Sequence, residues 1–435
     1  MTGFYFKNNM IKQYCFVLGF NHTLSKIEIL SILKKQEIKY RILETSQEIL
    51  ILEFQSVIDG ELLINRTGGI VKIGEIFTIA QAPKADEIFS RDLFNALANK
   101  LSPERLPGSY KFSISIYNAG AKLKYLYQLI RKKTKIGGTL KRVLSGGAST
   151  PYFLDKRERI ISCPTVKHAK LLKNGFEVLI CPGQKGIYIG KTIAIQDYES
   201  FSLRDYGRPD RNIRAGMIPP KLARMMINIA SPGNGARILD PFCGSGTILQ
   251  ELVMLGYKNI TGTDIDRVQL ENSGRNLTWL FDHYPHISKE KYKITLNLCD
   301  ARKLSQIFLG SGFDAVITEP YLGPPDSICF SPSEIDKEIN LLESLYQKTF
   351  EEFIKVIKPG GVVVTILPVF HLNRKLSFLN LQRVIPPGLT VKNMANIISG
   401  DIDILCLEVD RRGSVIYYHP DQFIYREIIV LEKIL

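Results

Sequence analysis

Residues 236–266 read ARILDPFCGSGTILQELVMLGYKNITGTDID, and this stretch decides the fold. A short apolar run ends at Asp240, a glycine loop follows, and residues from Thr247 onward have the apolar spacing of a helix. A second apolar run then ends at Asp264. This order predicts a β-α-β unit with parallel strands. Further helices near 268–281 and 334–357 alternate with strands, which predicts a Rossmann-like α/β domain over residues 218–435.

Two apolar stretches near the C-terminus, SVIYYHP and REIIVLEKIL, predict a further pair of strands. Five residues, 421–425, separate them, which is a short connection of the kind found in hairpins. We expect this pair at one edge of the sheet.

The N-terminal third has a different order of elements. Between residues 13 and 77 the pattern is β-α-β-β-α-β, with Thr23 as a candidate N-cap of the first helix. That order predicts an α+β ferredoxin-like domain over residues 1–80. A second α+β region is expected over residues 81–197, and a proline-rich linker over residues 198–217 joins it to the C-terminal domain.

The chain is basic, with 57 Lys plus Arg against 43 Asp plus Glu and a net charge of +14. Such an excess favours polyanionic partners. Residues 121–150 contain no acid and interleave Tyr125 and Tyr127 with basic side chains, as RNA-contacting surfaces do. A solvated helix face is the alternative. The RNA-binding candidates are Lys122, Lys124, Arg131, Lys132, Lys133, Lys135, Lys141 and Arg142.

Seven cysteines are present and none lie at CxxC spacing. This usage is typical of a reducing cytosol and argues against a bound metal or a disulfide framework. No run approaches roughly 20 uninterrupted apolar residues, the length of a membrane span. The N-terminus does not have the pattern of a signal peptide, so we expect a cytoplasmic protein with no membrane partner.

Three acids follow three successive predicted strands: Asp240, Asp264 and Asp300. Ligands of open parallel sheets bind beyond the carboxyl ends of the strands. There, a carboxylate after the second strand can accept the hydroxyls of a ribose, and Asp300 can meet an adenine amine. The glycine loop lacks the lysine of a P-loop and the third glycine of a dinucleotide fingerprint. Asp240 would repel a pyrophosphate but suits a cationic ligand, so the pattern favours S-adenosylmethionine.

The fourth strand ends in Thr318-Glu319-Pro320-Tyr321. An exocyclic base amine is a poor nucleophile, and hydrogen bonds from it to a carboxylate and a carbonyl can direct its lone pair toward a methyl donor. Glu319 can supply the carboxylate and Pro320 the carbonyl, which the fixed φ of proline holds in place. Tyr321 can stack on an extruded base. These three are the catalytic candidates.

The stretches DPFCGSGTI and EPY resemble the class I amino-methyltransferases. RPDRNIRAGMIPPKLARMMINIA and GTDID are more closely similar to the THUMP-domain tRNA guanine-N2 methyltransferases, which include the archaeal guanosine-10 enzymes. The resemblance implies a THUMP-like RNA-binding domain over residues 81–197. It also implies that the turn from Gly216 to Lys221 closes the methionine end of the cofactor site. The cofactor-binding candidates are Pro219, Asp240, Phe242, Gly244, Ser245, Gly246, Asp264 and Asp300.

The catalytic motif departs from that family, whose pattern is TDPPYG. Here Glu319 stands for the aspartate, and either one proline is lost or Leu322 takes the place of the aromatic residue. Methyl transfer to a base amine, with guanine N2 in tRNA as the favoured acceptor, remains the expected activity. A DNA adenine-N6 or cytosine-N4 methyltransferase is one alternative. A non-catalytic RNA-binding factor that retains the cofactor fold is another.

Overall fold

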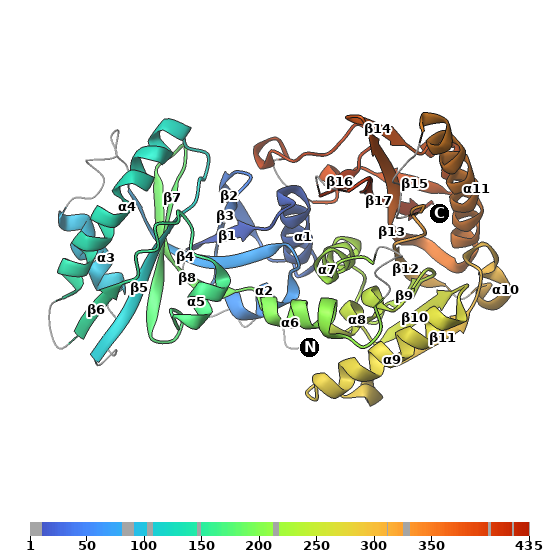
Figure 1. Cartoon of the computed structure of the whole chain (residues 1–435), viewed down its shortest axis with the longest axis horizontal. Helices are drawn as coiled ribbons and strands as arrows, with labels where there is room; N and C mark the ends of the chain where they lie inside the picture. Colours follow the sequence, from blue (N-terminus) through green and yellow to red (C-terminus); the bar gives the residue numbers. More distant parts are fainter. Residues whose placement is uncertain are drawn as a thin grey trace. The chain divides into compact units, whose positions relative to one another are not determined.

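The computed structural model describes residues 11–80, 91–101, 108–145, 149–211, 217–310, 312–324, 331–398, 402–419 and 422–434. The chain divides into two compact units (Figure 1). The first consists mainly of Glu37–Tyr198 together with the N-terminal strand. The second consists mainly of Glu199–Gly400 and Leu407–Leu435.

Residues 12–80 have the predicted β-α-β-β-α-β order. The elements are β1 (Lys12–Leu18), α1 (His22–Lys35), β2 (Tyr40–Thr45), β3 (Ile49–Phe54), α2 (Gly60–Arg66) and β4 (Ile70–Ala80). All of them belong to the first unit except α1, whose residues from Ile27 onward are grouped with the second unit. The strands pair antiparallel in the order β2-β3-β1-β4, which is the ferredoxin-like arrangement. The prediction of Thr23 as N-cap is wrong. Asn21 accepts the Leu24 N–H through Oδ1 at 2.9 Å, and Thr23 lies inside the helix.

The second predicted region extends the same sheet. It comprises α3 (Arg91–Leu101), β5 (Gly108–Ile116), α4 (Leu123–Leu144), β6 (Ser149–Phe153), α5 (Cys163–His168), β7 (Gly175–Pro182) and β8 (Ile187–Ile195). Because β8 pairs antiparallel with β4, one eight-stranded sheet runs through both expected N-terminal regions. Side chains of α3 and α4 pack on β5 and β7 to form its core.

The second unit is the predicted Rossmann-like domain. It contains α6 (Tyr198–Ser202), a π-helical turn (Leu203–Gly207), α7 (Pro220–Ala230), β9 (Arg237–Asp240), α8 (Thr247–Met254), β10 (Asn259–Asp264), α9 (Arg267–His283), β11 (Lys293–Leu298), α10 (Ser305–Phe308), β12 (Phe313–Thr318), α11 (Pro332–Val356) and β13 (Ile357–Leu372). Strands β11-β10-β9-β12-β13 are parallel in that spatial order. The order reverses between β9 and β12, which is where ligands of such sheets bind.

The C-terminal strands differ from the expectation. The predicted pair is β16 (Val415–Tyr417) and β17 (Ile424–Lys433), and the two pair antiparallel. However, β17 is an interior strand that lies between β13 and β15 (Leu389–Lys392). β14 (Lys375–Phe378) also pairs with β13. Residues 425–431 of β17 are all buried, which explains why this strand occupies the middle of the sheet rather than its edge.

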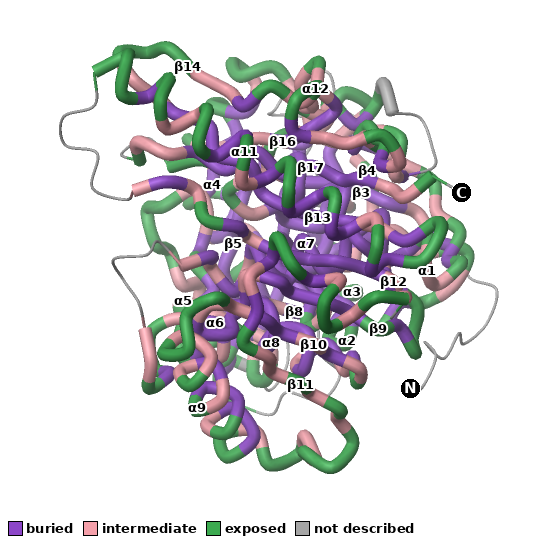
Figure 2. The backbone as a smooth tube through the Cα atoms, turned by 90° about the vertical axis from the view of Figure 1, so that its right-hand side faces the viewer, coloured by how far each residue is buried: buried purple, intermediate pink, exposed green. Residues whose placement is uncertain are grey.

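The core of this domain lies between α11 and the sheet, where Phe350, Phe353 and Leu367 are fully buried. Figure 2 draws long stretches of β13 and β17 as buried, in agreement with the buried runs of these two strands. No helix within the described ranges is long and apolar enough to cross a membrane. The six described cysteines are free thiols, and Cys329 lies outside the described residues.

Candidate active site

A cavity of about 440 Å³ opens at the carboxyl ends of the parallel strands, at the reversal between β9 and β12. Nine of the eleven predicted catalytic and cofactor-binding residues line it: Asp240, Phe242, Gly244, Ser245, Asp264, Asp300, Glu319, Pro320 and Tyr321. The fold therefore brings most of the predicted residues together around one cavity. Four acids from the ends of four strands converge there, as the register of a parallel sheet requires.

Pro219 and Gly246 are not among the lining residues. Pro219 is the N-cap residue of α7, so it sets the start of that helix. Gly246 begins α8 with φ of +88°, and a Cβ there would lie 2.5 Å from Ser273 Oγ. Both residues position the segments of the cavity wall, but neither of them lines the cavity. Gly216 lies outside the described residues, while Met217 and Ile218 from the same expected turn do line the cavity.

Asp264 ties the end of β10 to the glycine loop. Its Oδ2 accepts the Gly244 N–H at 2.9 Å, and its Oδ1 accepts the Asp266 N–H at 2.9 Å. Burial raises the pKa of Asp264, and these two backbone hydrogen bonds oppose that rise. Gly244 has φ of +49° and nothing within 4 Å of the place where a Cβ would stand. A side chain here would fill the space that a ligand needs beside the loop.

Asp240 is the most deeply buried acid of the site, with 1% of its surface exposed. Burial raises the pKa of Asp240 to about 7, although hydrogen bonds from Thr318 and from the Phe242 N–H lower it. The Thr318 hydroxyl donates to Asp240 Oδ1 at 2.7 Å. A cationic ligand would favour the ionised form of this carboxyl, and the two opposite charges would attract each other.

Asp300 follows β11 and is held by its neighbour. Arg302 Nε donates to Asp300 Oδ1 at 2.9 Å and Arg302 Nη2 donates to Oδ2 at 2.6 Å. The hydrogen bond from Arg302 lowers the pKa of Asp300. A carboxylate has about four acceptor positions, so Asp300 can still accept a hydrogen bond from a ligand amine.

Glu319 forms a buried ion pair that the sequence did not suggest. Arg426 Nε, from β17, donates to Glu319 Oε1 at 2.6 Å, and the two side chains are 8% and 10% exposed, Arg426 first. Burial raises the pKa of Glu319, and the charge of Arg426 opposes that rise. The guanidinium therefore favours the ionised carboxylate and fixes one of its oxygens. Glu319 Oε2 has no partner among the described residues.

The next two residues of the motif face the same cavity. The Tyr346 hydroxyl, on α11, donates to the Tyr321 carbonyl at 3.1 Å and so anchors the backbone after Pro320. Tyr321 is 53% exposed, which leaves a face of its ring open. An exposed aromatic ring beside a carboxylate and a fixed carbonyl can hold a flat, amine-bearing group.

Several lining residues were missed by the sequence analysis. Ile265 follows the ribose-binding candidate and is 65% exposed within the wall, so it offers an apolar surface to a ring. Asp266, Gln269 and Arg302 also line the cavity. The apolar residue directly after Asp264 could have indicated a ligand contact, since the loop after a strand rarely needs an apolar side chain. Nothing in the sequence linked Arg426 to Glu319 across 107 positions.

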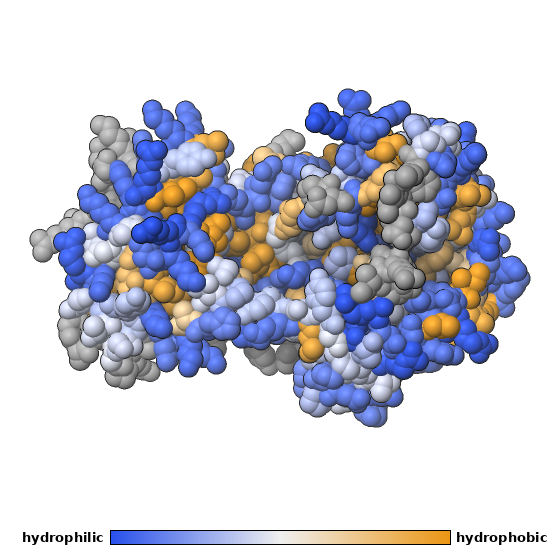
Figure 3. Space-filling model, in the orientation of Figure 1, coloured by the Kyte–Doolittle hydropathy of each residue, from blue (hydrophilic) through white to orange (hydrophobic). Residues whose placement is uncertain are grey.

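The basic candidates lie on and beside α4, in the first unit, and all but two are exposed. Lys124, Arg131, Lys135 and Arg142 are separated by seven, four and seven residues, which places them along one face of the helix. In the space-filling view, hydrophilic side chains with some hydrophobic ones between them cover the part of the molecule where Figure 1 places α4 (Figure 3). Lys122 and Lys141 are exposed near the two ends, and Lys132 is partly buried.

Lys133 contradicts the prediction. It is 3% exposed, and its ammonium donates to the carbonyls of Lys156 and Glu158. Burial lowers the pKa of Lys133. The side chain lies on the apolar face of α4 with Leu129 and Ile136, so it supports the fold and does not present charge to a partner.

Comparisons with known proteins agree with this geometry. Residues 208–377 match a family model described as UPF0020, RMKL-like, methyltransferase domain. The tRNA (guanine(10)-N2)-dimethyltransferase of Methanothermobacter thermautotrophicus is 33% identical over 179 residues, which cover 41% of this chain and 46% of that protein. The protein of the same name from Methanocaldococcus jannaschii is 28% identical over 222 residues, 48% of this chain and 54% of that protein. The match thus spans about half the length of these relatives.

One solved structure resembles the whole chain in fold. TrmN from Thermus thermophilus superimposes with a TM-score of 0.56 at 16% sequence identity, covering 98% of this chain and 100% of that one. At this identity the likeness shows the fold alone. The fold class predicted from the sequence, an α+β N-terminal part followed by a Rossmann-like domain, is confirmed.

Proposed function

We propose that this chain, which carries a methyltransferase domain of the UPF0020 family in residues 208–377, is an S-adenosylmethionine-dependent RNA methyltransferase acting on an exocyclic base amine. Guanine N2 in tRNA is the favoured acceptor, in keeping with the names of the archaeal relatives. The observation that carries the proposal is the convergence of Asp240, Asp264, Asp300 and Glu319 on one cavity at the sheet reversal. A cytoplasmic location is part of the proposal.

The charged residues that line the cavity suit this cofactor. The strand order places Asp300, Asp264 and Asp240 side by side along one edge of the sheet. In that order they suit an adenine amine, a ribose diol and an ammonium group. Gly244 leaves room for the ligand beside the loop. S-adenosylmethionine supplies a methyl group on a sulfonium, and its two positive charges suit a site lined by acids.

The acceptor end is built by the fourth strand. Glu319 would accept one hydrogen bond from the target amine through Oε2, and the Pro320 carbonyl would accept another. The charge of Arg426 favours the ionised form of the Glu319 carboxylate, and its hydrogen bond orients that group. Tyr321 would stack on the base. Such positioning and electrostatic effects suffice for transfer from an activated methyl donor.

We assign capture of the RNA to the region over residues 81–197 and the chemistry to residues 218–435, with residues 198–217 as the linker. The exposed basic face of α4, carrying Lys124, Arg131 and Lys135, supports this division. Contacts between basic side chains and phosphates hold nucleic acid without reading its sequence. This face lies outside the methyltransferase domain, and that position is its only argument against the DNA-modifying alternative. DNA is therefore included as a substrate in the test.

The proposal is tested by mapping modified nucleosides. RNA from a strain that lacks this protein is incubated with the purified chain and S-adenosylmethionine, and its nucleosides are measured by mass spectrometry. We expect methylguanosine to increase in the tRNA fraction. Methylation of DNA but not of RNA would support the alternative acceptor. Cofactor binding without methylation of any cellular nucleic acid would support the non-catalytic role.

A further inference from the structure

We propose that Arg208 is an additional binding residue of the cavity and takes the carboxylate of the cofactor's methionine end. This inference rests on the proposed function, because it presumes a ligand that carries an amino acid. It assigns a cation to a site whose charged lining residues are mostly acids. S-adenosylmethionine carries one anionic group besides its cations, and a buried carboxylate requires hydrogen-bond donors.

Arg208 lies directly behind the cavity wall. Its Nη1 donates to the Thr247 hydroxyl at 2.7 Å, and its Nη2 lies 2.9 Å from the sulfur of Met217. Both of these partners line the cavity, as does Ser245, whose hydroxyl lies 3.6 Å from the same sulfur. The strand order puts this end of the cavity, beside β9 and the start of α8, opposite the expected adenine end at β11.

The guanidinium has unused hydrogen-bonding capacity although it is only 3% exposed. Its Nε has no hydrogen-bond partner among the described residues, and a thioether is a weak acceptor for Nη2. No ion pair joins it to an acid within the part of the chain that the structure describes. Burial lowers the pKa of Arg208 to about 10, so the side chain remains charged at neutral pH. Burying a cation that has only weak hydrogen-bond partners costs free energy of folding, unless a ligand supplies the missing acceptors.

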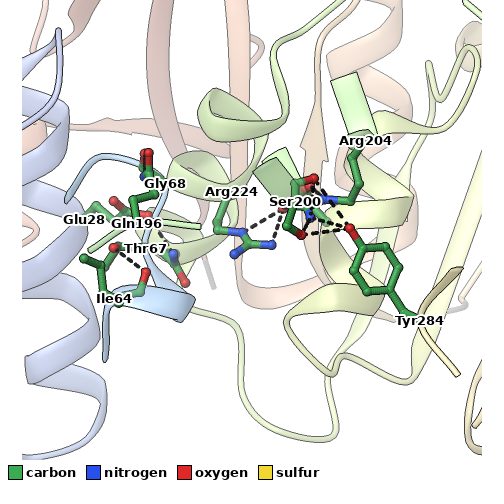
Figure 4. Close-up of polar contacts among 11 residues, drawn as sticks. Glu28, Ile64, Thr67, Gly68, Gln196, Ser200, Arg204, Arg224 and Tyr284 are labelled. Carbon is green, nitrogen blue, oxygen red and sulfur yellow. Dashed lines mark hydrogen bonds and ion pairs between the residues drawn. The ribbon is translucent and has the colours of Figure 1, made fainter. Parts of the chain in front are cut away.

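The segment that carries Arg208 is held in place independently of any ligand. Arg204, one helical turn earlier, donates through Nε to Glu251 of α8 at 2.5 Å and through Nη1 to the Ser200 carbonyl at 2.9 Å. Figure 4 shows Arg204, Ser200 and Tyr284 converging. Arg224 of α7 donates to the second oxygen of Glu251 at 2.7 Å. Arg208 is therefore fixed beside the cavity before a ligand enters, as a pre-organised binding group should be.

The chemistry of the partner follows from the burial. Arg208 exposes 3% of its surface, so a ligand can reach its guanidinium only from inside the cavity, which argues against the phosphates of an RNA backbone. A carboxylate inside the cavity can reach Nη2 if the flexible Met217 side chain turns aside. Arginine binds carboxylates through paired, charge-assisted hydrogen bonds. Thr247 and Ser245 offer hydroxyl donors to the same anion.

Calorimetry on the full chain tests this with two ligands. S-adenosylhomocysteine carries the amino acid, whereas 5′-methylthioadenosine has the same nucleoside without it. We expect Arg208→Gln to weaken S-adenosylhomocysteine binding by about 10- to 100-fold, the range of a charge-assisted hydrogen bond. Binding of 5′-methylthioadenosine should stay within about twofold of the wild type. Arg208→Lys keeps the positive charge but loses the two parallel N–H donors of the guanidinium. Its affinity for S-adenosylhomocysteine should fall between those of the wild type and Arg208→Gln.

Arg412→Gln is the control, because Arg412 is a partly buried arginine of the same domain, with 24% of its side chain exposed, that pairs with Glu427 away from the cavity. Equal losses for both ligands in Arg208→Gln would overturn the inference and leave Arg208 a support for the wall. If the Arg208 variants do not fold, the wild type is titrated with decarboxylated S-adenosylhomocysteine. Undiminished affinity for that ligand would also refute a carboxylate contact. Binding of neither nucleoside by the wild type would instead contradict the proposed function.

Discussion

Replacing Glu319 with glutamine should abolish most of the methyl transfer while preserving ligand binding. The buried carboxylate has one oxygen on Arg426 and the other without a partner among the described residues. Glutamine keeps the shape but offers a neutral amide, so the target amine loses its charged acceptor. Groups of this kind contribute about 10²- to 10⁴-fold to the chemical step. Single-turnover assays with saturating cofactor measure that step without interference from binding or product release.

The same substitution has a cost for folding that must be separated from chemistry. It leaves the Arg426 guanidinium, 8% exposed, without its carboxylate. Breaking one side of a buried pair lowers the free energy of unfolding by about 3–5 kcal/mol. Adding Arg426→Gln to Glu319→Gln removes the unpaired charge, so stability should return in part while transfer stays slow. Glu427→Gln is the matched control, since Glu427 is a neighbouring buried acid of β17 that pairs with Arg412 outside the cavity.

Arg426→Gln alone gives a distinct signature in the pH dependence of the rate. The charge of Arg426 holds down a Glu319 pKa that burial raises. Without that charge the pKa of Glu319 rises further, so the carboxyl is already protonated at a higher pH. The acid limb of the rate profile therefore moves to higher pH. Activity should therefore recover as the pH is raised in Arg426→Gln but not in Glu319→Gln. Wild-type single-turnover rates in Glu319→Gln would refute amine activation by this residue.

Four further outcomes are expected. S-adenosylhomocysteine should bind about tenfold more weakly at pH 6 than at pH 8. A pKa of about 7 leaves Asp240 largely protonated at pH 6, and only its carboxylate form attracts the ammonium group of the ligand. An affinity that does not change with pH in calorimetry would exclude this role. Asp264→Ala should weaken the same binding by about 1.5–3 kcal/mol, and unchanged affinity would remove Asp264 from the site. Alanine at Lys124, Arg131 and Lys135 should lower RNA affinity and reduce its salt slope by up to roughly 2–3 units, whereas the same change at the exposed Lys289, Lys291 and Lys293 should not. Lys133→Ala should leave RNA binding intact but lower the free energy of unfolding by about 1–3 kcal/mol in urea titrations, since two backbone carbonyls lose their donor; a selective loss of RNA affinity would contradict its structural role.

The local pattern of the sequence was sufficient for the fold class and for much of the site. Asp240, Asp264 and Asp300 each end a short apolar run, and the carboxyl ends of parallel strands meet at one edge of a sheet. Their convergence therefore followed from β-α-β periodicity alone. Gly244 and Gly246 were identifiable because a loop of this kind needs positive φ, which both adopt.

Features that depend on which segments become neighbours in space were decided by the tertiary structure alone. Helical spacing places Lys133 on the apolar face of α4 with Leu129 and Ile136, but only the folded chain shows that two backbone carbonyls meet its ammonium there. The interior place of β17 brings Arg426 to Glu319 across 107 positions, and the fold of the linker brings Arg208 behind Met217 and Thr247. A sequence records the side chains that can form such contacts. Long-range packing selects which of them meet, because only in the folded chain are they held together away from water.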